Sequence, residues 1–253
     1  MRVLVVSDPE EGGAFVADGI AALIRTRPDA VLGVATGSTP LPVYSALRER
    51  LDGIPVDRVR AFALDEYVGL PVEHPESYRS VITREFVEPL GLDPARVQVP
   101  DGALDRLATA GDRYEAMLNE AGDVDLQILG IGANGHIGFN EPGSAFTSRT
   151  RVVDLAEQTI LDNARFFPSV DDVPRRAVTQ GIATILDARE LALLAFGAHK
   201  ADAVARAVEG PVTEAMPASV LQRHPAATLV IDEAAAAGLT ARSAELIVDR
   251  VAS

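Results

Sequence analysis

The sequence of 253 residues contains no cysteine, and only one of its 23 basic residues, Lys200, is a lysine. Without cysteine, the chain has neither a disulfide framework nor a thiolate metal site. No segment approaches the roughly 20 apolar residues needed to cross a bilayer, and the first apolar run is too short for a signal peptide. These absences predict a cytoplasmic protein.

Basic charge is also scarce, because 37 acidic residues give the chain a net charge of −14. Such a surplus argues against nucleic acid and membrane surfaces as partners. It leaves small anionic ligands open, since salt confines surface fields to about 8 Å. Lys200 is then either a chance survivor or a compact ammonium kept for a tight site, where Lys and Arg are not interchangeable.

The chain shows no linker, repeat or low-complexity run, so residues 1–253 are expected to form a single domain. Buried apolar runs alternate with amphipathic segments, which predicts an α/β fold with a mostly parallel sheet covered on both faces. Strands are expected at 2–7, 30–35, 59–64, 126–129, 151–155, 191–196 and 227–231. Helices are expected from 16 to 28, 40 to 51, 77 to 90, 104 to 121, 157 to 167, 177 to 186, 200 to 208 and 240 to 251.

Four of these strands end in polar residues, and carboxyl ends of parallel strands share one edge of a sheet. The polar groups are Thr36-Gly37-Ser38-Thr39, Asp65 with Glu66, the loop 130–144 (GIGANGHIGFNEPGS), and the residues 197–200 (GAHK). The loop is too rich in glycine for helix or strand, yet it contains amide, imidazole and carboxylate groups. The sequence therefore predicts one active site built from four chain segments.

The segment Thr36–Pro40 offers free backbone N–H groups, hydroxyls and a helix start, which together form an anion cradle suited to phosphate. The plainer interpretation is an ordinary turn, with Thr39 as the N-cap and Pro40 as the first helical residue. Lys200 can supply a point charge for a phosphate. Asp65 is either a general base tuned by partial burial or a cap.

His136 and Glu141 are close enough in the loop to face each other, and a carboxylate can fix the tautomer of an imidazole. A metal site is not expected, because no other histidine has ligand spacing. The glycines at 130, 132 and 135 match the dinucleotide fingerprint, but the following Gly138 and Pro142 oppose the helix that this motif must open. A nicotinamide cofactor is therefore not predicted.

Taken together, these motifs resemble the glucosamine-6-phosphate deaminase family along nearly the whole chain. The matching segments are ATGSTP (35–40), LDEYVGL (64–70), HPESY (74–78), the loop 130–144, SRTRVV (148–153), NARFFP (163–168) and GAHKADAV (197–204). The resemblance implies a Rossmann-like three-layer αβα sandwich. It implies conversion of glucosamine 6-phosphate and water to fructose 6-phosphate and ammonia, without a metal or organic cofactor.

The resemblance also assigns roles to residues. Asp65 matches the base that moves a proton between C2 and C1, and His136 matches the residue that opens the pyranose ring, assisted by Glu141 and Asn134. The residues matching the phosphate site are Thr36, Gly37, Ser38, Thr39, Arg165 and Lys200. The expected partner is therefore an amino sugar phosphate, and assembly into a homo-oligomer is left open.

Two positions depart from the family pattern. Many members carry Asp where this chain has Asn134, and Asn cannot accept a proton, so ring opening is expected to rest on His136 and Glu141. Members activated by N-acetylglucosamine 6-phosphate have a lysine where this chain has Val153, so weak or absent activation is predicted. The alternatives are a 6-phosphogluconolactonase-like hydrolase and a sugar-phosphate sensor domain. The lactonase does not need the carboxylate of NEP or LDEY in this form.

Overall fold

The computed structural model describes residues 1–240, which are organised around a seven-stranded sheet in which every strand pairing is parallel. Its spatial order is β1-β10-β9-β6-β2-β3-β5. The strands are β1 (Arg2–Val6), β2 (Val31–Val34), β3 (Arg60–Ala63), β5 (Val97–Gln98), β6 (Leu126–Leu129), β9 (Glu190–Ala195) and β10 (Ala227–Asp232). All except the two-residue β5 were expected from their apolar runs, which are buried because helices cover the sheet.

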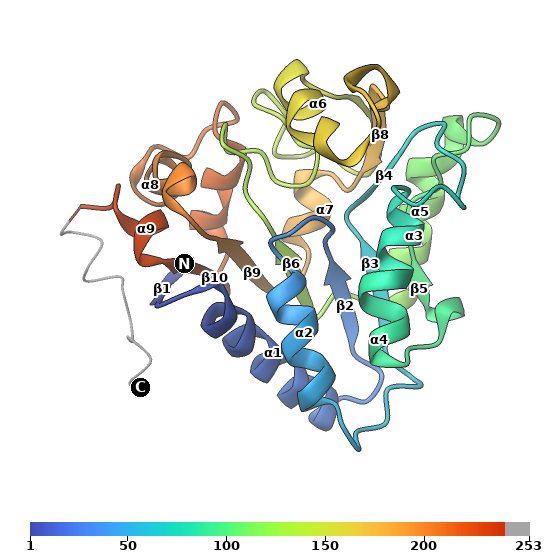
Figure 1. Cartoon of the computed structure of the whole chain (residues 1–253), viewed down its shortest axis with the longest axis horizontal. Helices are drawn as coiled ribbons and strands as arrows, with labels where there is room; N and C mark the ends of the chain where they lie inside the picture. Colours follow the sequence, from blue (N-terminus) through green and yellow to red (C-terminus); the bar gives the residue numbers. More distant parts are fainter. Residues whose placement is uncertain (241–253) are drawn as a thin grey trace.

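Helices lie on both faces of this sheet, with α1 and α2 in front and α5 behind in the view of Figure 1. The α-helices are α1 (Pro9–Thr26), α2 (Leu41–Arg50), α3 (Tyr78–Ile82), α4 (Glu88–Leu90), α5 (Ala110–Ala121), α6 (Glu157–Asn163), α7 (Ile182–Leu186), α8 (Ala201–Glu209) and α9 (Glu233–Ala236). A π-helix, η1 (Thr83–Val87), joins α3 to α4. The predicted three-layer α/β fold is confirmed. None of the helices within residues 1–240 has the length and apolar character needed to cross a membrane.

A second, three-stranded antiparallel sheet has the order β4-β8-β7. It consists of β4 (Asp65–Tyr67), β8 (Arg176–Thr179) and β7 (Arg151–Asp154). The predicted helix 177–186 is therefore wrong in its first half, since only Ile182–Leu186 is helical. The run Ala177-Val178-Thr179 favours a strand once β4 and β7 lie on its two sides, and pairing overrides the helical pattern.

Three other boundaries differ from expectation. The predicted helix 104–121 begins only at Ala110, after the 3₁₀ turn η3 (Leu107–Thr109). Helix α2 begins at Leu41 with Pro40 at the cap position and no capping side chain, so the predicted N-cap role of Thr39 is wrong. The predicted helix Thr240–Val251 lies, apart from its first residue, outside the described residues.

The order of the strands creates a crevice between β2 and β6. From β2 the sheet grows through β3 to β5, whereas β6 pairs with the opposite side of β2. In open α/β sheets, ligands bind outside the carboxyl ends of the strands at such a switch point. The four strands with polar ends, β9, β6, β2 and β3, are adjacent in the sheet, so their polar residues meet at this crevice.

Candidate active site

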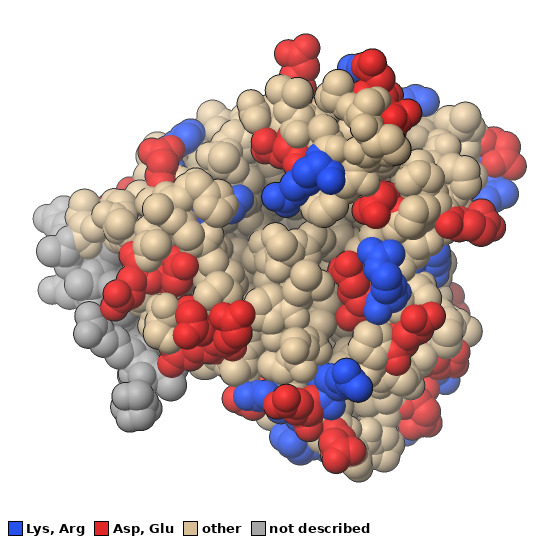
Figure 2. All heavy atoms as spheres, viewed as in Figure 1, with Lys and Arg blue, Asp and Glu red and all other residues tan. Residues whose placement is uncertain are grey.

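A cavity of about 880 Å³ opens at the carboxyl ends of the four adjacent strands. Of the ten site residues expected from the sequence, all except Asn134 and Glu141 line it. They are Thr36, Gly37, Ser38, Thr39, Asp65, His136, Arg165 and Lys200. Figure 2 shows acidic and basic side chains interspersed over this face rather than one basic patch. An anion is therefore held by local donors, not by a broad field.

The loop after β2 lies at one end of the cavity and has the geometry of an anion cradle. Gly37 adopts a positive φ of 86°, a conformation that favours glycine. No side chain caps α2, so its first N–H groups are free for a ligand. The unused cap supports the anion-binding interpretation over the ordinary-turn alternative.

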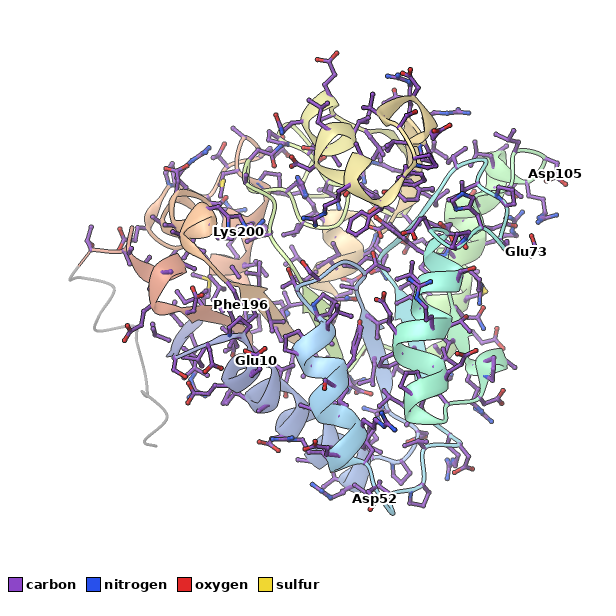
Figure 3. The ribbon with its side chains drawn as sticks, viewed as in Figure 1. Glu10, Asp52, Glu73, Asp105, Phe196 and Lys200 are labelled. Atoms are coloured by element: carbon purple, nitrogen blue, oxygen red, sulfur yellow. The ribbon has the colours of Figure 1, made fainter. Side chains whose placement is uncertain are left out.

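Two cations face this cradle. Lys200 follows β9 and donates from Nζ to the backbone oxygen of Ile131 over 2.7 Å, and Figure 3 shows it beside Phe196. Burial lowers the pKa of Lys200, Asp162 opposes the change and Arg165 adds to it. Arg165 lines the same cavity, and its guanidinium lies 4.7 Å from the centroid of the Phe166 ring.

Asp65 is buried at the end of β3, with 6% of its surface exposed. Burial, reinforced by the negative charge of Glu66, raises the pKa of Asp65 to about 8. Among the described residues, none donates a hydrogen bond to its carboxylate, although the neighbouring Glu66 accepts three. An unpaired buried carboxylate with a pKa near neutrality is suited to take and return a proton.

Glu66 fixes the backbone beside Asp65. Its carboxylate accepts from the backbone N–H groups of Tyr67, Tyr78 and Arg79 at 2.8–2.9 Å. These bonds tie β4 to the start of α3, so the LDEY and HPESY motifs form one unit. Burial nevertheless raises the pKa of Glu66 against the effect of these donors. Glu66 is therefore an anchor, while Asp65 is left free.

Glycines in the loop after β6 give His136 its room. A Cβ atom at Gly132 would lie 2.2 Å from the imidazole ring, so only glycine permits the ring to lie over this position. The backbone N–H of Gly132 also donates to the oxygen of His136 over 2.9 Å. A Cβ at Gly138 would lie 3.5 Å from Asp65 Oδ2, which places the base and the imidazole loop side by side.

The orientation of His136 is set by Asn134 rather than by a direct bond to Glu141. Nδ1 of His136 lies 2.8 Å from Asn134 Oδ1, whereas Glu141 Oε2 is 3.6 Å away. Asn134 in turn donates from Nδ2 to Glu141 Oε2 over 2.6 Å, which fixes the direction of its amide. Because the amide oxygen only accepts, Nδ1 carries the proton and Nε2 is left as the basic nitrogen.

Glu141 is ionised behind this relay. Burial opposes ionisation, but the His136 ring, the hydroxyl of Thr159 and the amide of Asn134 together lower the pKa of Glu141 to about 2. Thr159 Oγ1 donates to Glu141 Oε1 over 2.5 Å and lines the cavity. The sequence gave no signal for Thr159, since it lies inside an expected helix. The aromatic wall formed by Tyr67, Tyr78 and Phe139 was likewise not predicted.

Within the described part of the chain, no group of three or more His, Cys, Asp or Glu side chains could hold a metal ion. The expected absence of a metal and of an organic cofactor stays a prediction. The groups that the cavity does assemble are an anion cradle with two cations, an unpaired carboxylate and an oriented imidazole. Together they can hold a phosphate ester and move protons at carbon and oxygen.

Comparison with known proteins gives the same direction. Residues 10–230 match the family described as glucosamine-6-phosphate isomerases/6-phosphogluconolactonase. The chain is 56% identical over 240 residues to a glucosamine-6-phosphate deaminase from Pseudarthrobacter chlorophenolicus, covering 94% of this chain and 93% of the relative. It is 56% identical over 242 residues to the protein of that name from Streptomyces coelicolor, with the same coverage.

Solved structures extend the comparison. A monomeric glucosamine-6-phosphate deaminase superposes with a TM-score of 0.91 at 43% identity, covering 94% of this chain and 100% of that one. The 6-phosphogluconolactonase from Leishmania guyanensis superposes with a TM-score of 0.76 at 23% identity, covering 95% of this chain and 99% of the other. The second likeness concerns the fold alone.

Proposed function

The chain belongs to the family of glucosamine-6-phosphate isomerases and 6-phosphogluconolactonases, and from this premise we propose that it is a glucosamine-6-phosphate deaminase. It converts glucosamine 6-phosphate and water to fructose 6-phosphate and ammonia. The phosphate is held by the loop 36–39 together with Arg165 and Lys200. This placement leaves the sugar carbons between Asp65 and His136, which line the same cavity.

Ring opening is the first step. A proton must leave the C1 hydroxyl and a proton must reach the ring oxygen. His136 performs this exchange through Nε2, because Nδ1 holds its own proton toward Asn134 Oδ1. Asn134 cannot take up a proton, so its part is to hold the tautomer. The charge of Glu141 stabilises the imidazolium that forms during the transfer.

Proton transfer between carbons follows. Asp65 removes the proton at C2 of the open-chain sugar and returns it to C1, which passes through an enediol-type intermediate that keeps nitrogen on C2. The product is an imine at C2, and its hydrolysis by water gives the ketone and ammonia. A base for this step needs an environment that favours return of the proton, and burial supplies it by raising the pKa of Asp65 to about 8.

The observation that carries the proposal is the buried, unpaired Asp65 beside the oriented His136. Lactone hydrolysis moves no proton between carbons, so a 6-phosphogluconolactonase would have no use for such a carboxylate. The test supplies both substrates and measures ammonia from glucosamine 6-phosphate and acid from the lactone. Ammonia release supports the deaminase, and acid release without ammonia overturns it.

We expect the activity to fall on the acid side with a pKa near 8. The base must be ionised to accept the proton from C2, and protonation of Asp65 removes it, so kcat/KM decreases as the pH falls below about 8. The measurement is kcat/KM from pH 6 to 9, corrected with the substrate amine's own pKa measured by NMR. A corrected profile that is flat over this range would contradict the assignment.

Activation by N-acetylglucosamine 6-phosphate is expected to be weak or absent. A second cavity of about 410 Å³ contains Arg151, but Val153 and Asp154 also line it. Arg151 is already engaged by Asn140 Oδ1 and Ser144 Oγ, and Asp154 would repel a phosphate. Velocity curves should therefore be hyperbolic, with and without this compound. A sigmoidal curve that becomes hyperbolic on its addition would contradict the prediction.

Three further parts of the proposal concern the whole protein. A single domain spanning residues 1–253 is supported by a family match that covers residues 10–230. The cytoplasmic location stays a prediction. Assembly is also open to measurement, and the likeness to a monomeric deaminase favours a chain that is active without partner subunits.

A further inference from the structure

The segment that covers the cavity contacts both the substrate side and the catalytic relay. This cover segment, residues 155–175, runs between β7 and β8 and contains α6. Figure 1 shows α6 in the upper lobe, above the carboxyl ends of the sheet. Arg165 of this segment faces the cavity. Thr159, on α6, is 4% exposed and points to Glu141.

A continuous chain of hydrogen bonds leads from the cover segment to the imidazole. Thr159 Oγ1 donates to Glu141 Oε1 over 2.5 Å, and Asn134 Nδ2 donates to Glu141 Oε2 over 2.6 Å. Asn134 Oδ1 then accepts from Nδ1 of His136 over 2.8 Å. Thr159 and Asn134 are the only donors within hydrogen-bond distance of this carboxylate in residues 1–240. Each oxygen is thus held by one donor.

We propose that Thr159 is a positioning residue of the reaction: its hydroxyl, delivered from the cover segment, holds Glu141 where Asn134 keeps His136 in the Nδ1–H tautomer. Without this hydroxyl, Glu141 retains one bond and can rotate. Its Oε2 then approaches His136 Nδ1, now 3.6 Å away, or turns into the second cavity, which Glu141 also lines. Either movement releases the Asn134 amide and, with it, the imidazole.

The cover segment has a second anchor, so the hydroxyl of Thr159 is not needed to keep the segment in place. Phe167 is buried and packs edge-on against Tyr67, with ring centroids 5.8 Å apart. It also stacks on His74 at 6.0 Å. Removing the hydroxyl should therefore disturb the relay while Arg165 keeps its place at the phosphate.

The inference rests on the proposed function, and substitution of Thr159 by valine tests it. Valine keeps the shape of the side chain and removes the donor. In Thr159→Val we expect kcat for ammonia release to fall about 10- to 100-fold, as small misplacements of a catalytic group do. KM for glucosamine 6-phosphate should stay within about threefold, and Thr159→Ser should restore kcat to within about threefold.

Thr184 provides a matched control. It is also buried, and its hydroxyl donates to the carboxylate of Glu115 over 2.6 Å, outside the cavity. Thr184→Val removes the same kind of bond and should leave kcat within about threefold of the parent. The proposal is overturned if Thr159→Val keeps kcat within that range, if the loss appears in KM instead, or if serine does not restore it.

A second measurement is independent of turnover. The ¹⁵N resonances of the His136 ring report its tautomer, and they should show protonated Nδ1 in the parent and in Thr159→Ser. In Thr159→Val, a substantial fraction of the other tautomer is expected, and an unchanged spectrum would overturn the inference. A parent protein that releases no ammonia would sink the proposed function, whereas the spectra would still decide the role of Thr159.

Discussion

Replacing Asp65 by asparagine is expected to reduce kcat by about 10³-fold or more, the larger part of what a positioned base contributes. Asparagine has nearly the same shape and cannot accept the proton from C2. The phosphate contacts lie elsewhere in the cavity, so inhibition by inorganic phosphate should be unchanged. Steady-state ammonia release measures the loss. Normal turnover in this variant would remove Asp65 from the mechanism.

The same substitution should stabilise the fold, which separates lost chemistry from misfolding. The pKa of Asp65 is about 8 in the folded chain and near 3.9 in an unfolded one. The folded state therefore retains a proton that the unfolded state loses, and stability decreases as the pH rises from about 4 to 8. Each pH unit in this range costs at most about 1.4 kcal/mol, and asparagine avoids this cost.

Thermal unfolding checks the second effect. For a chain of this size, 1 kcal/mol shifts Tm by roughly 2–4 °C. Asp65→Asn should melt at the same temperature as the parent near pH 4, and the advantage of the variant should widen toward pH 8. A variant that melts lower than the parent at pH 8 would show that the native carboxylate has a partner, against the assignment of a free base.

The strands were predictable because each one of the main sheet is a short apolar run buried between two layers of helices. The run Leu126–Leu129 is of this kind, and its strand β6 matches the expected bounds. Strand β8 was not predictable, because Ala177-Val178-Thr179 becomes a strand only through pairing with β4 and β7. Those partners lie far away in the sequence, and local pattern contains no record of them.

The site divides in the same way. Polar residues at strand ends indicated one cavity, since the order of a parallel sheet brings its carboxyl ends together, and the cavity contains Asp65, His136 and Lys200 as expected. Sequence spacing suggested a direct contact between His136 and Glu141. The structure inserts the Asn134 amide between them, a matter of side-chain geometry in an irregular loop. Thr159 reaches Glu141 from another segment, so spacing could not reveal it.

Substitution of Lys200 by alanine is the second large effect that we expect, and it should act on binding. Among the described residues, no carboxylate forms an ion pair with Lys200, and one of its three N–H donors is used by Ile131. The others are free for a phosphate oxygen in a half-buried site. A charge-assisted bond of this kind contributes about 1.5–3 kcal/mol, so KM should rise about 10- to 100-fold. The fall in kcat should be much smaller.

Inorganic phosphate distinguishes a lost phosphate contact from a displaced loop. As a competitive inhibitor it reports the phosphate site without the sugar, and its inhibition constant should rise by about the same factor as KM in Lys200→Ala. Lys200→Arg keeps the charge but brings a wide planar group into a site fitted to an ammonium, so it should recover only part of the affinity. If Lys200→Ala left both constants unchanged, Lys200 would have no part in holding the phosphate, and its bond to Ile131 would be purely structural.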